Sequence, residues 1–225
     1  MQTLCISLGG SVVSNKDGLN VDYLRKMSAL LKKHKDKKFI IVTGGGYTNR
    51  KYIELLRKSG AGEFLLDEVG IAFTKVNATA AKAFFEDAYP NVVSSLDELK
   101  KAHMSNRIVF CSGLLPGITT DAVSILMCEA VGCSKMINVS GISGLYNMDP
   151  SKRGAKKLGK ISHDELVKLT EKFDTREAKV PFVFDLVASK LAKRSNIRID
   201  FIGSDLKELE YAISGKRHNG SVVEG

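Results

Sequence analysis

Two glycine clusters, each placed where a hydrophobic strand gives way to a helix, constrain the fold of this chain most. The first is Leu8-Gly9-Gly10-Ser11, and the second is Val42-Thr43-Gly44-Gly45-Gly46, with Arg50 one helical turn further on. Glycine allows a tight turn and lets a ligand approach the backbone without a Cβ in the way. The N–H groups of such a turn, backed by a helix N-terminus, form an anion site. Two anion sites predict that two phosphate-bearing ligands meet, as phosphoryl transfer requires.

The rest of the chain alternates apolar, β-rich runs with stretches of helical period. This alternation predicts an α/β fold with a mainly parallel sheet covered by helices. The predicted strands are 4–8, 39–42, 91–93, 108–111, 136–139, 197–202 and a short one after 219–220. The predicted helices include 66–85, 185–194 and 205–213, with Ser204 as the N-cap of the last. The polar stretch 147–162 is predicted to be a long, functional loop.

Composition excludes several classes of protein. Lysine and arginine number 34 against 25 acidic residues, an excess that favours a solvated lysine-rich surface over attraction of anionic substrates. The basic residues are scattered without an aromatic-rich basic motif, which argues against nucleic-acid binding. No apolar run could span a bilayer, and the N-terminus lacks the basic start of a signal peptide. Four cysteines without CxxC spacing are predicted to be reduced, buried thiols of a cytoplasmic protein, and four histidines without metal-ligand spacing to lie at the surface.

The long helix predicted at 66–85 carries two kinds of stripe. One is apolar and contains Val69, Phe73, Val76, Ala80 and Phe84. The other is small and polar and contains Asp67, Gly70, Thr74 and Asn77. Periodicity leaves two interpretations of the polar stripe open: it lines a pocket for a polar ligand, or it is a solvated face. The absence of lysine and glutamate from the stripe supports the pocket.

Two further stretches have the composition of ligand sites. Residues 116–121 (PGITTD) follow a predicted strand and open a helix, at the sheet edge where ligands of α/β proteins bind. A capping threonine and an early aspartate explain part of this stretch, but not two threonines beside a Pro-Gly turn. Tyr146 and Asp149 could hold a nucleoside base and ribose, although Asp149-Pro150 is also a common turn starter.

Together these stretches resemble the amino acid kinase superfamily and, within it, the archaeal type of uridylate kinase. The resemblance covers essentially the whole chain. It rests on these motifs in order: Leu8-Gly9-Gly10-Ser11, Val42-Thr43-Gly44-Gly45-Gly46 with Arg50-Lys51-Tyr52-Ile53, Asp67 with Gly70-Ile71, Thr74 and Asn77-Ala78, Pro116-Gly117 with Thr119-Thr120-Asp121-Ala122, Tyr146 with Asp149-Pro150, and His218-Asn219-Gly220.

The resemblance implies a three-layer α/β/α sandwich in a single domain, residues 1–225, with an acceptor-side lobe at 1–110 and an ATP-side lobe at 111–225. It implies an enzyme that moves the γ-phosphate of ATP, with Mg²⁺, onto UMP to give UDP in pyrimidine nucleotide biosynthesis. It also implies a cytoplasmic homohexamer built from dimers, with small nucleotides and neither nucleic acid nor membrane as partners.

The resemblance also implies roles for individual residues. The catalytic positions are Gly10, Arg50 and Asp121. The ATP-binding positions are Gly9, Gly10, Gly45, Arg50, Ser140, Tyr146 and Asp149. The UMP-binding positions are Gly44, Asp67, Leu115, Pro116, Gly117, Ile118, Thr119, Thr120 and Asp121. No side chain is expected to ligate the metal, because the nucleotide phosphates hold most of the Mg²⁺. Asp121 is interpreted as an organiser of nearby donors rather than a base, since a UMP phosphate is already ionised at neutral pH.

The chain departs from the family pattern at four positions. Ser7 and Asp185 stand where much of the superfamily has lysine. Many archaeal uridylate kinases lack these lysines as well. Gly141 and Ser143 replace the Asn and Asp of the family's usual Thr-Asn-Val-Asp-Gly-Val-Tyr stretch, a change that would alter ATP affinity if those side chains steady the nucleoside pocket. Two alternatives stay open. One is an isopentenyl phosphate kinase, although that family usually carries a first-strand lysine and a histidine after the GGG turn that this chain lacks. The other is a non-catalytic nucleotide- or oxyanion-binding relative, which the changes at Gly141 and Ser143 leave possible.

Overall fold

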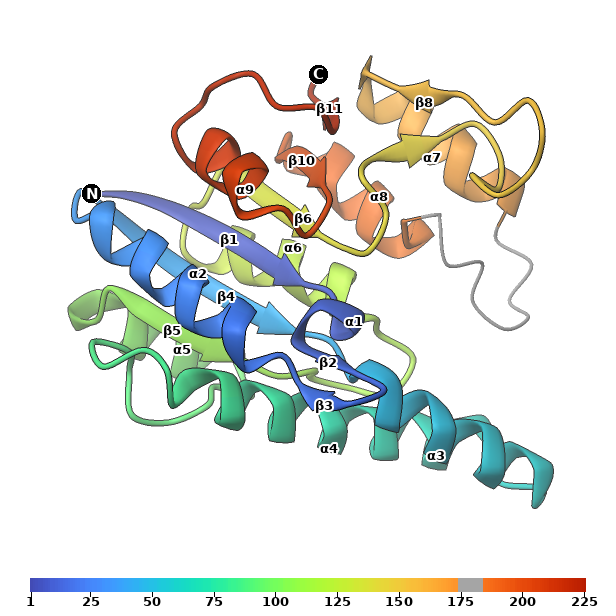
Figure 1. Ribbon diagram of the computed structural model, residues 1–225, viewed down its shortest axis with the longest axis horizontal. Coiled ribbons are helices and arrows are strands. Elements are labelled where there is room, and N and C mark those ends of the chain that lie inside the picture. The colour runs from blue at the N-terminus through green and yellow to red at the C-terminus, as the bar shows by residue number, and fades with distance from the viewer. Residues whose placement is uncertain (174–183) are drawn as a thin grey trace.

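The computed structural model describes residues 1–173 and 184–225, and within them seven strands form one sheet with helices on both faces (Figure 1). The strand order is β5-β4-β1-β6-β10-β11-β9. All neighbouring strands are parallel except β10 and β11. The strands are β1 (Gln2–Leu8), β4 (Lys37–Thr43), β5 (Ile108–Cys111), β6 (Lys135–Val139), β9 (Lys160–Ile161), β10 (Arg198–Ile202) and β11 (Ser221–Val223). The predicted α/β/α sandwich around a mainly parallel sheet is confirmed.

Two apolar cores separate the sheet from its helices. One core packs α2 (Val21–Lys33), α9 (Leu206–Ile213) and the end of α4 (Glu63–Lys82) against one face. The other packs α5 (Leu96–Ser105), α6 (Thr120–Ala130), α7 (His163–Phe173) and α8 (Leu186–Arg194) around the opposite face. Side chains of β1 alternate between them, since Leu4 and Ile6 join the first core and Cys5 the second.

The remaining elements lie next to the ends of the strands. Helix α1 (Gly10–Val13) follows β1 directly, and α3 (Gly46–Lys58) follows β4. Two small ribbons pair β2 (Ser14–Asn15) with β3 (Gly18–Leu19), and β7 (Leu145–Tyr146) with β8 (Lys157–Leu158). Strand β9 joins the sheet at its edge through β11.

Several predicted boundaries were wrong for local reasons. In the described chain, residues 91–93 form no strand, because only Val93 bridges to Cys111. Asp205, not Ser204, caps α9, since its carboxylate accepts a hydrogen bond from the Lys207 N–H at 2.9 Å. The stretch 147–162 is not one long loop, because it contains β8 and β9.

Helix α4 turns its small, polar stripe inward at Thr74 and Asn77. The apolar stripe is not fully buried, since Val76 is 61% exposed. The polar stripe is not a solvated face either, since Thr74 and Asn77 are buried. Helix α4 therefore presents its small, polar side toward the ends of β4 and β5, where backbone groups need hydrogen-bond partners.

All four cysteines are free and buried, as predicted, in the part of the chain that the structure describes. The histidine prediction was wrong at two positions. The side chains of His163 and His218 are buried, and His163 Nε2 lies 2.9 Å from the carbonyl oxygen of Ile197. No helix within residues 1–173 and 184–225 is both long and apolar enough to cross a membrane.

A group of ionic side chains lies along the amino-terminal halves of β6 and β10. Lys135 Nζ is 2.6 Å from Asp200 Oδ2, and Arg198 Nε is 2.8 Å from Asp200 Oδ1. His218 Nε2 lies 3.2 Å from Asp200, and Arg198 also pairs with Glu224 at 2.7 Å. These five ionisable residues form one group of contacts near the amino ends of β6 and β10. Burial acts to raise the pKa of Asp200, but His218 and Lys135 outweigh it and lower that pKa to about 2.

Candidate active site

The two glycine turns lie against each other at the carboxyl ends of β1 and β4 (Figure 1). Gly44 N–H donates to the Leu8 carbonyl at 3.0 Å, and Gly9 N–H donates to the Val139 carbonyl of β6 at 2.8 Å. A Cβ added to Gly44 would lie 2.5 Å from the Gly10 nitrogen. A Cβ on Gly10 would in turn overlap the backbone of Gly46. The glycines are therefore required because two backbones meet where side chains would collide.

This contact leaves backbone donors without protein acceptors. Among the described residues, the N–H groups of Gly10, Ser11 and Gly45 make no hydrogen bond. Gly46 has a φ of +78° and opens α3, whose N-terminal end carries partial positive charge. Polar backbone groups that the protein does not satisfy are suited to phosphate oxygens.

Arg50 lies on the first turn of α3, as its spacing predicted. Its side chain is exposed, and no hydrogen bond or ion pair holds the guanidinium within the described ranges. Its neighbour Lys51 differs, because it pairs with Glu54 at 3.7 Å. A planar fork of five donors without a protein carboxylate is suited to grip phosphate oxygens.

The predicted acceptor segment, residues 115–121, is held from the side by α4. The Gly117 N–H donates to Asp67 Oδ2 at 2.7 Å, across 50 positions of sequence. Thr119 caps α6, since its hydroxyl accepts from the Ala122 N–H at 3.2 Å. Leu115 is 63% exposed. The structure thus brings Asp67 and this segment together.

The rest of the polar stripe on α4 supports the backbone. Asn77 Nδ2 donates to the Gly44 carbonyl at 2.8 Å, and Thr74 Oγ1 accepts from the Gly113 N–H at 2.8 Å. A Cβ on Gly70 would lie 3.9 Å from Asn49 of α3. Of the predicted pocket-lining stripe, Asp67 reaches the acceptor segment, whereas Thr74 and Asn77 fix the loops around it.

Asp121 lies at the start of α6, beside the end of β1. Its Oδ1 atom accepts a hydrogen bond from the Ser7 hydroxyl at 3.0 Å and another from Asn138 Nδ2 at 2.8 Å. Ser7 was noted in the sequence only as a missing lysine, and Asn138 was missed. A lone asparagine in an apolar strand carries no motif that could have identified it.

The predicted ATP-side residues are spread along the segment after β6. Ser140 donates its N–H to the Ile202 carbonyl at 3.1 Å, and its hydroxyl binds the carbonyl of Ile142 at 2.9 Å. A Cβ on Gly141 would lie 3.6 Å from the Ser11 hydroxyl, so this loop begins beside the first glycine turn. Tyr146 lies in β7.

The Asp149 carboxylate is engaged within its own turn. Oδ1 accepts from the Ser151 hydroxyl at 2.7 Å and from the Ser151 N–H at 2.9 Å. These hydrogen bonds, the hydroxyl one first, lower the pKa of Asp149. The common Asp-Pro turn therefore describes the observed geometry, and a ribose would have to bind the oxygen lone pairs that remain.

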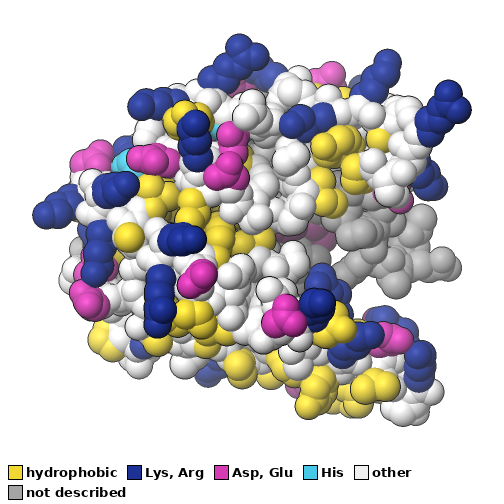
Figure 2. Space-filling view, in the orientation of Figure 1, with side chains coloured by type: hydrophobic (Ala, Val, Ile, Leu, Met, Phe, Trp, Pro, Cys, Tyr) yellow, Lys and Arg dark blue, Asp and Glu magenta, His cyan; other side chains and the backbone are white. Residues whose placement is uncertain are grey.

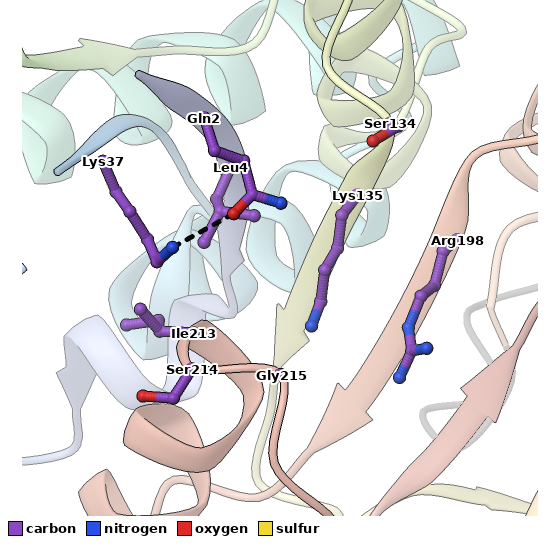
Figure 3. A pocket seen from close by; sticks show the side chains of 9 residues that line it. All are labelled: Gln2, Leu4, Lys37, Ser134, Lys135, Arg198, Ile213, Ser214 and Gly215. Carbon is purple, nitrogen blue, oxygen red and sulfur yellow. Dashed lines mark hydrogen bonds between the residues drawn. The ribbon is translucent and has the colours of Figure 1, made fainter.

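A hollow of about 330 Å³ at the opposite end of the sheet carries three cations (Figure 3). Lys37, Lys135 and Arg198 extend into it near the end of α9. Each already has an acidic partner, because Lys37 pairs with Asp36 and the other two with Asp200. Compensated cations have little charge left for a nucleotide, so this hollow does not compete with the glycine turns as the candidate site.

The chain is similar to known proteins along nearly its whole length. A model of the amino acid kinase family matches residues 2–202. Uridylate kinase from Pyrococcus abyssi is 39% identical over 226 residues, covering 98% of this chain and 99% of that protein. Uridylate kinase from Thermoplasma volcanium is 36% identical over 217 residues, covering 96% and 94%. The crystal structure of uridylate kinase from Archaeoglobus fulgidus matches with a TM-score of 0.85 at 30% identity, covering 99% of this chain and all of that one.

Proposed function

The chain belongs to the amino acid kinase family, and from that premise we propose that it joins ATP and UMP where its two glycine turns meet. The activity is that of a UMP kinase, ATP-dependent phosphorylation of UMP, since uridylate kinases match the chain along nearly their whole length. The contact of the Gly10 and Gly44 backbones is the observation that carries the location of the reaction.

The transferred phosphoryl group lies between the turns in this proposal. Gly9, Gly10 and Gly45 surround it, and Arg50 neutralises charge on its oxygens. Unsatisfied N–H groups at Gly10 and Gly45 support this role. Phosphoryl transfer needs two aligned anions and compensation of their charge more than covalent help from the protein. Fixed amides and an unpaired guanidinium provide both.

UMP occupies the acceptor side. Gly44 borders its phosphate, and Asp67 holds the segment that surrounds the nucleoside, whose members are Leu115, Pro116, Gly117, Ile118, Thr119, Thr120 and Asp121. The bond between Asp67 and the Gly117 N–H supports this assignment. Asp121 acts as an organiser of neighbouring donors, in keeping with the hydrogen bonds that it accepts from Ser7 and Asn138.

ATP occupies the side formed by the chain after β6. Ser140, Tyr146 and Asp149 contact it in this proposal, and Gly9 and Gly10 receive its terminal phosphate. The closeness of Gly141 to Ser11 supports the assignment of this loop to the donor. From these assignments we propose two lobes, with residues 1–110 on the acceptor side and 111–225 on the ATP side. Residues 115–121 belong to the second lobe but contribute to the UMP site.

Mg²⁺ fits the residues present if the nucleotide holds most of it. No group of three or more His, Cys, Asp or Glu side chains within the described residues could cage a metal ion. Mg²⁺ commonly keeps several waters and binds through substrate phosphates and one or two carboxylates. The Asp121 carboxylate lies beside the first turn, where it accepts from Ser7, and is not assigned to the metal in this proposal. When bound, the ion supplies neutralisation of the phosphate charge.

We propose a homohexamer built from dimers, and exposed apolar residues on α3 and α4 support association between copies. Hydrophobic side chains gather at the lower edge of the view in Figure 2, where α3 and α4 lie in Figure 1. The exposed apolar residues of α3 and α4 include Tyr52, Leu55, Phe64, Leu65 and Val76. Exposed apolar patches of this kind mark interaction surfaces. Light scattering coupled to size-exclusion chromatography tests the assembly, and a monomeric mass would contradict it.

A substrate panel tests the proposed activity. Purified protein with ATP and Mg²⁺ is offered UMP, CMP, dUMP or isopentenyl phosphate, and release of ADP is followed. UMP is expected to be phosphorylated far faster than isopentenyl phosphate. ATP binding without UMP turnover would point to a binding protein, and turnover of isopentenyl phosphate alone would point to the lipid-precursor kinase.

A further inference from the structure

Ser7 and Asn138 are register partners on neighbouring strands, and both donate to the same oxygen of Asp121. Parallel pairing sets Ser7 of β1 directly beside Asn138 of β6. The Ser7 hydroxyl lies 3.0 Å and the Asn138 amide 2.8 Å from Asp121 Oδ1. Three elements, two strands and the start of α6, therefore converge on one carboxylate atom.

The pleat explains why these side chains meet. Paired residues of adjacent strands project to the same face of a sheet. The face that carries Ser7 is the one covered by α6, because Cys5, two residues earlier, contacts the Ser124 carbonyl of that helix at 3.5 Å. The last residues of β1 and β6 on this face thus lie under the first turn of α6. Asp121 occupies that turn.

Asn138 is an unfavourable residue for its position. Its strand neighbours Met136, Ile137 and Val139 are fully buried and apolar. Asparagine is disfavoured in strands, and a polar group next to an apolar core needs a hydrogen bond to offset its desolvation. The bond to Asp121 meets that need.

The two donors that fix the carboxylate are both neutral groups. A lysine in the place of Ser7 would bring a full positive charge, whereas a hydroxyl and an amide are neutral. Two donors from separate strands restrict both the position and the rotation of the Asp121 side chain. A preorganised group of this kind costs no rearrangement when the substrates react.

We propose that Asn138, together with Ser7, is a positioning residue for phosphoryl transfer that holds Asp121 in its working orientation. The inference rests on the proposed function, because it gives Asp121 a task only if ATP and UMP meet at the glycine turns. Asn138 acts through Asp121 and touches neither nucleotide.

Kinetics of Asn138→Ala test the proposal. We expect kcat to fall about 10-fold to 100-fold, as positioning losses do, while KM for UMP and for ATP changes less than about 3-fold. Asn106→Ala is the matched control: Asn106 is also half-buried, and its amide Nδ2 also donates, at 2.7 Å, to the Ala102 carbonyl. It caps the end of α5, just before the amino end of β5 and away from the glycine turns, and its loss should leave kcat unchanged.

A double-mutant comparison separates positioning from general structural damage. In an Asp121→Asn background, Asn138→Ala should lower kcat by less than about 2-fold further, since the group that it positions is already altered. An equal loss of kcat in both backgrounds would overturn the proposal. So would a wild-type kcat in Asn138→Ala. If Asn138→Ala does not fold, Ser7→Ala removes the other donor and is subject to the same two criteria.

The outcomes distinguish this inference from the proposed function. Wild-type protein that fails to turn over UMP overturns the proposed function and the inference with it. Wild-type protein with normal UMP turnover, and an Asn138→Ala variant that matches it, overturns the inference alone.

Discussion

The two ends of the central sheet hold their polar groups in opposite ways. At the amino end, Asp200 is surrounded by Lys135, Arg198 and His218, so that the charges compensate one another inside the protein. At the carboxyl end, the glycine turns present backbone N–H groups that no described residue accepts, and Arg50 has no acidic partner there. One end compensates its charges internally, and the other keeps the donors that the proposed function assigns to a ligand.

The difference teaches where stability and activity should respond to mutation. Internal ion pairs contribute to folding, because removal of one partner leaves a buried charge without compensation. Unpaired donors at the surface contribute little to folding and are available for transition-state charge. Substitutions at the amino end should therefore reduce stability at constant kcat, and substitutions at the carboxyl end should do the reverse.

The largest effect is expected at the amino end. Asp200→Ala leaves Lys135 and Arg198 without their shared carboxylate and should lower the free energy of unfolding by about 3–5 kcal/mol, measured by urea denaturation. The kcat of the folded fraction should stay unchanged. Glu86→Gln, which breaks the exposed pair of Glu86 with Lys32, serves as the control and should leave the unfolding midpoint almost where it was. A stable Asp200→Ala protein would contradict the contrast between the two ends.

The matching change at the carboxyl end is Arg50→Ala. Loss of an unpaired guanidinium beside the transferred phosphoryl should lower kcat about 100-fold to 1,000-fold, with a much smaller effect on KM for UMP. Steady-state kinetics measure both, and thermal melting should show an unchanged Tm. Lys51→Ala, one residue further along α3, is the control. Normal turnover of Arg50→Ala would remove this residue from the transition state.

A pH titration sharpens the comparison further. The pKa of Asp200 is lowered from 3.8 to about 2 in the folded protein. Its contribution is therefore complete above pH 4 and disappears as the pH falls toward 2, a loss of about 2 kcal/mol. Urea midpoints between pH 5 and pH 2 should fall more steeply for the wild type than for Asp200→Asn. Parallel curves would show that Asp200 does not drive the acid response.

The smallest effect is expected for Asp67→Ala. Removal of the anchor for the Gly117 N–H should loosen residues 115–121 and raise KM for UMP about 10-fold, which corresponds to about 1.4 kcal/mol. KM for ATP should change little. Glu68→Ala, the exposed neighbour on α4, provides the control. Equal changes in both nucleotide constants would argue that Asp67 does not act on the acceptor side alone.

Local signals in the sequence predicted much of the fold. Glycine clusters at strand ends, the alternation of strands and helices, and the Asp67 and 115–121 stretches were recognised because each depends on neighbouring residues. The orientation of α4 was not predictable from its hydropathy, because Thr74 and Asn77 are drawn inward by backbone groups of Gly113 and Gly44, which are 39 and 33 positions away.

The missed residues share the same cause. Asn138 is functional in our interpretation only through Ser7 and Asp121, which lie on other elements. His218 looked like a surface histidine until the fold set it beside Asp200. Sequence periodicity describes one element at a time, so pairs made across the sheet escape it.

The order β10-β11-β9 has a consequence for synthesis of the protein on the ribosome. Strand β9, at residues 160–161, joins the sheet through β11, at residues 221–223. The Leu145 N–H also donates to Ser221 Oγ at 2.8 Å. At about 5–20 residues per second, the roughly 60 residues between β9 and β11 take several seconds to translate. The segment around Tyr146 therefore leaves the exit tunnel early, but its hydrogen bond to Ser221 and the pairing of β9 with β11 can form only after β11 has emerged.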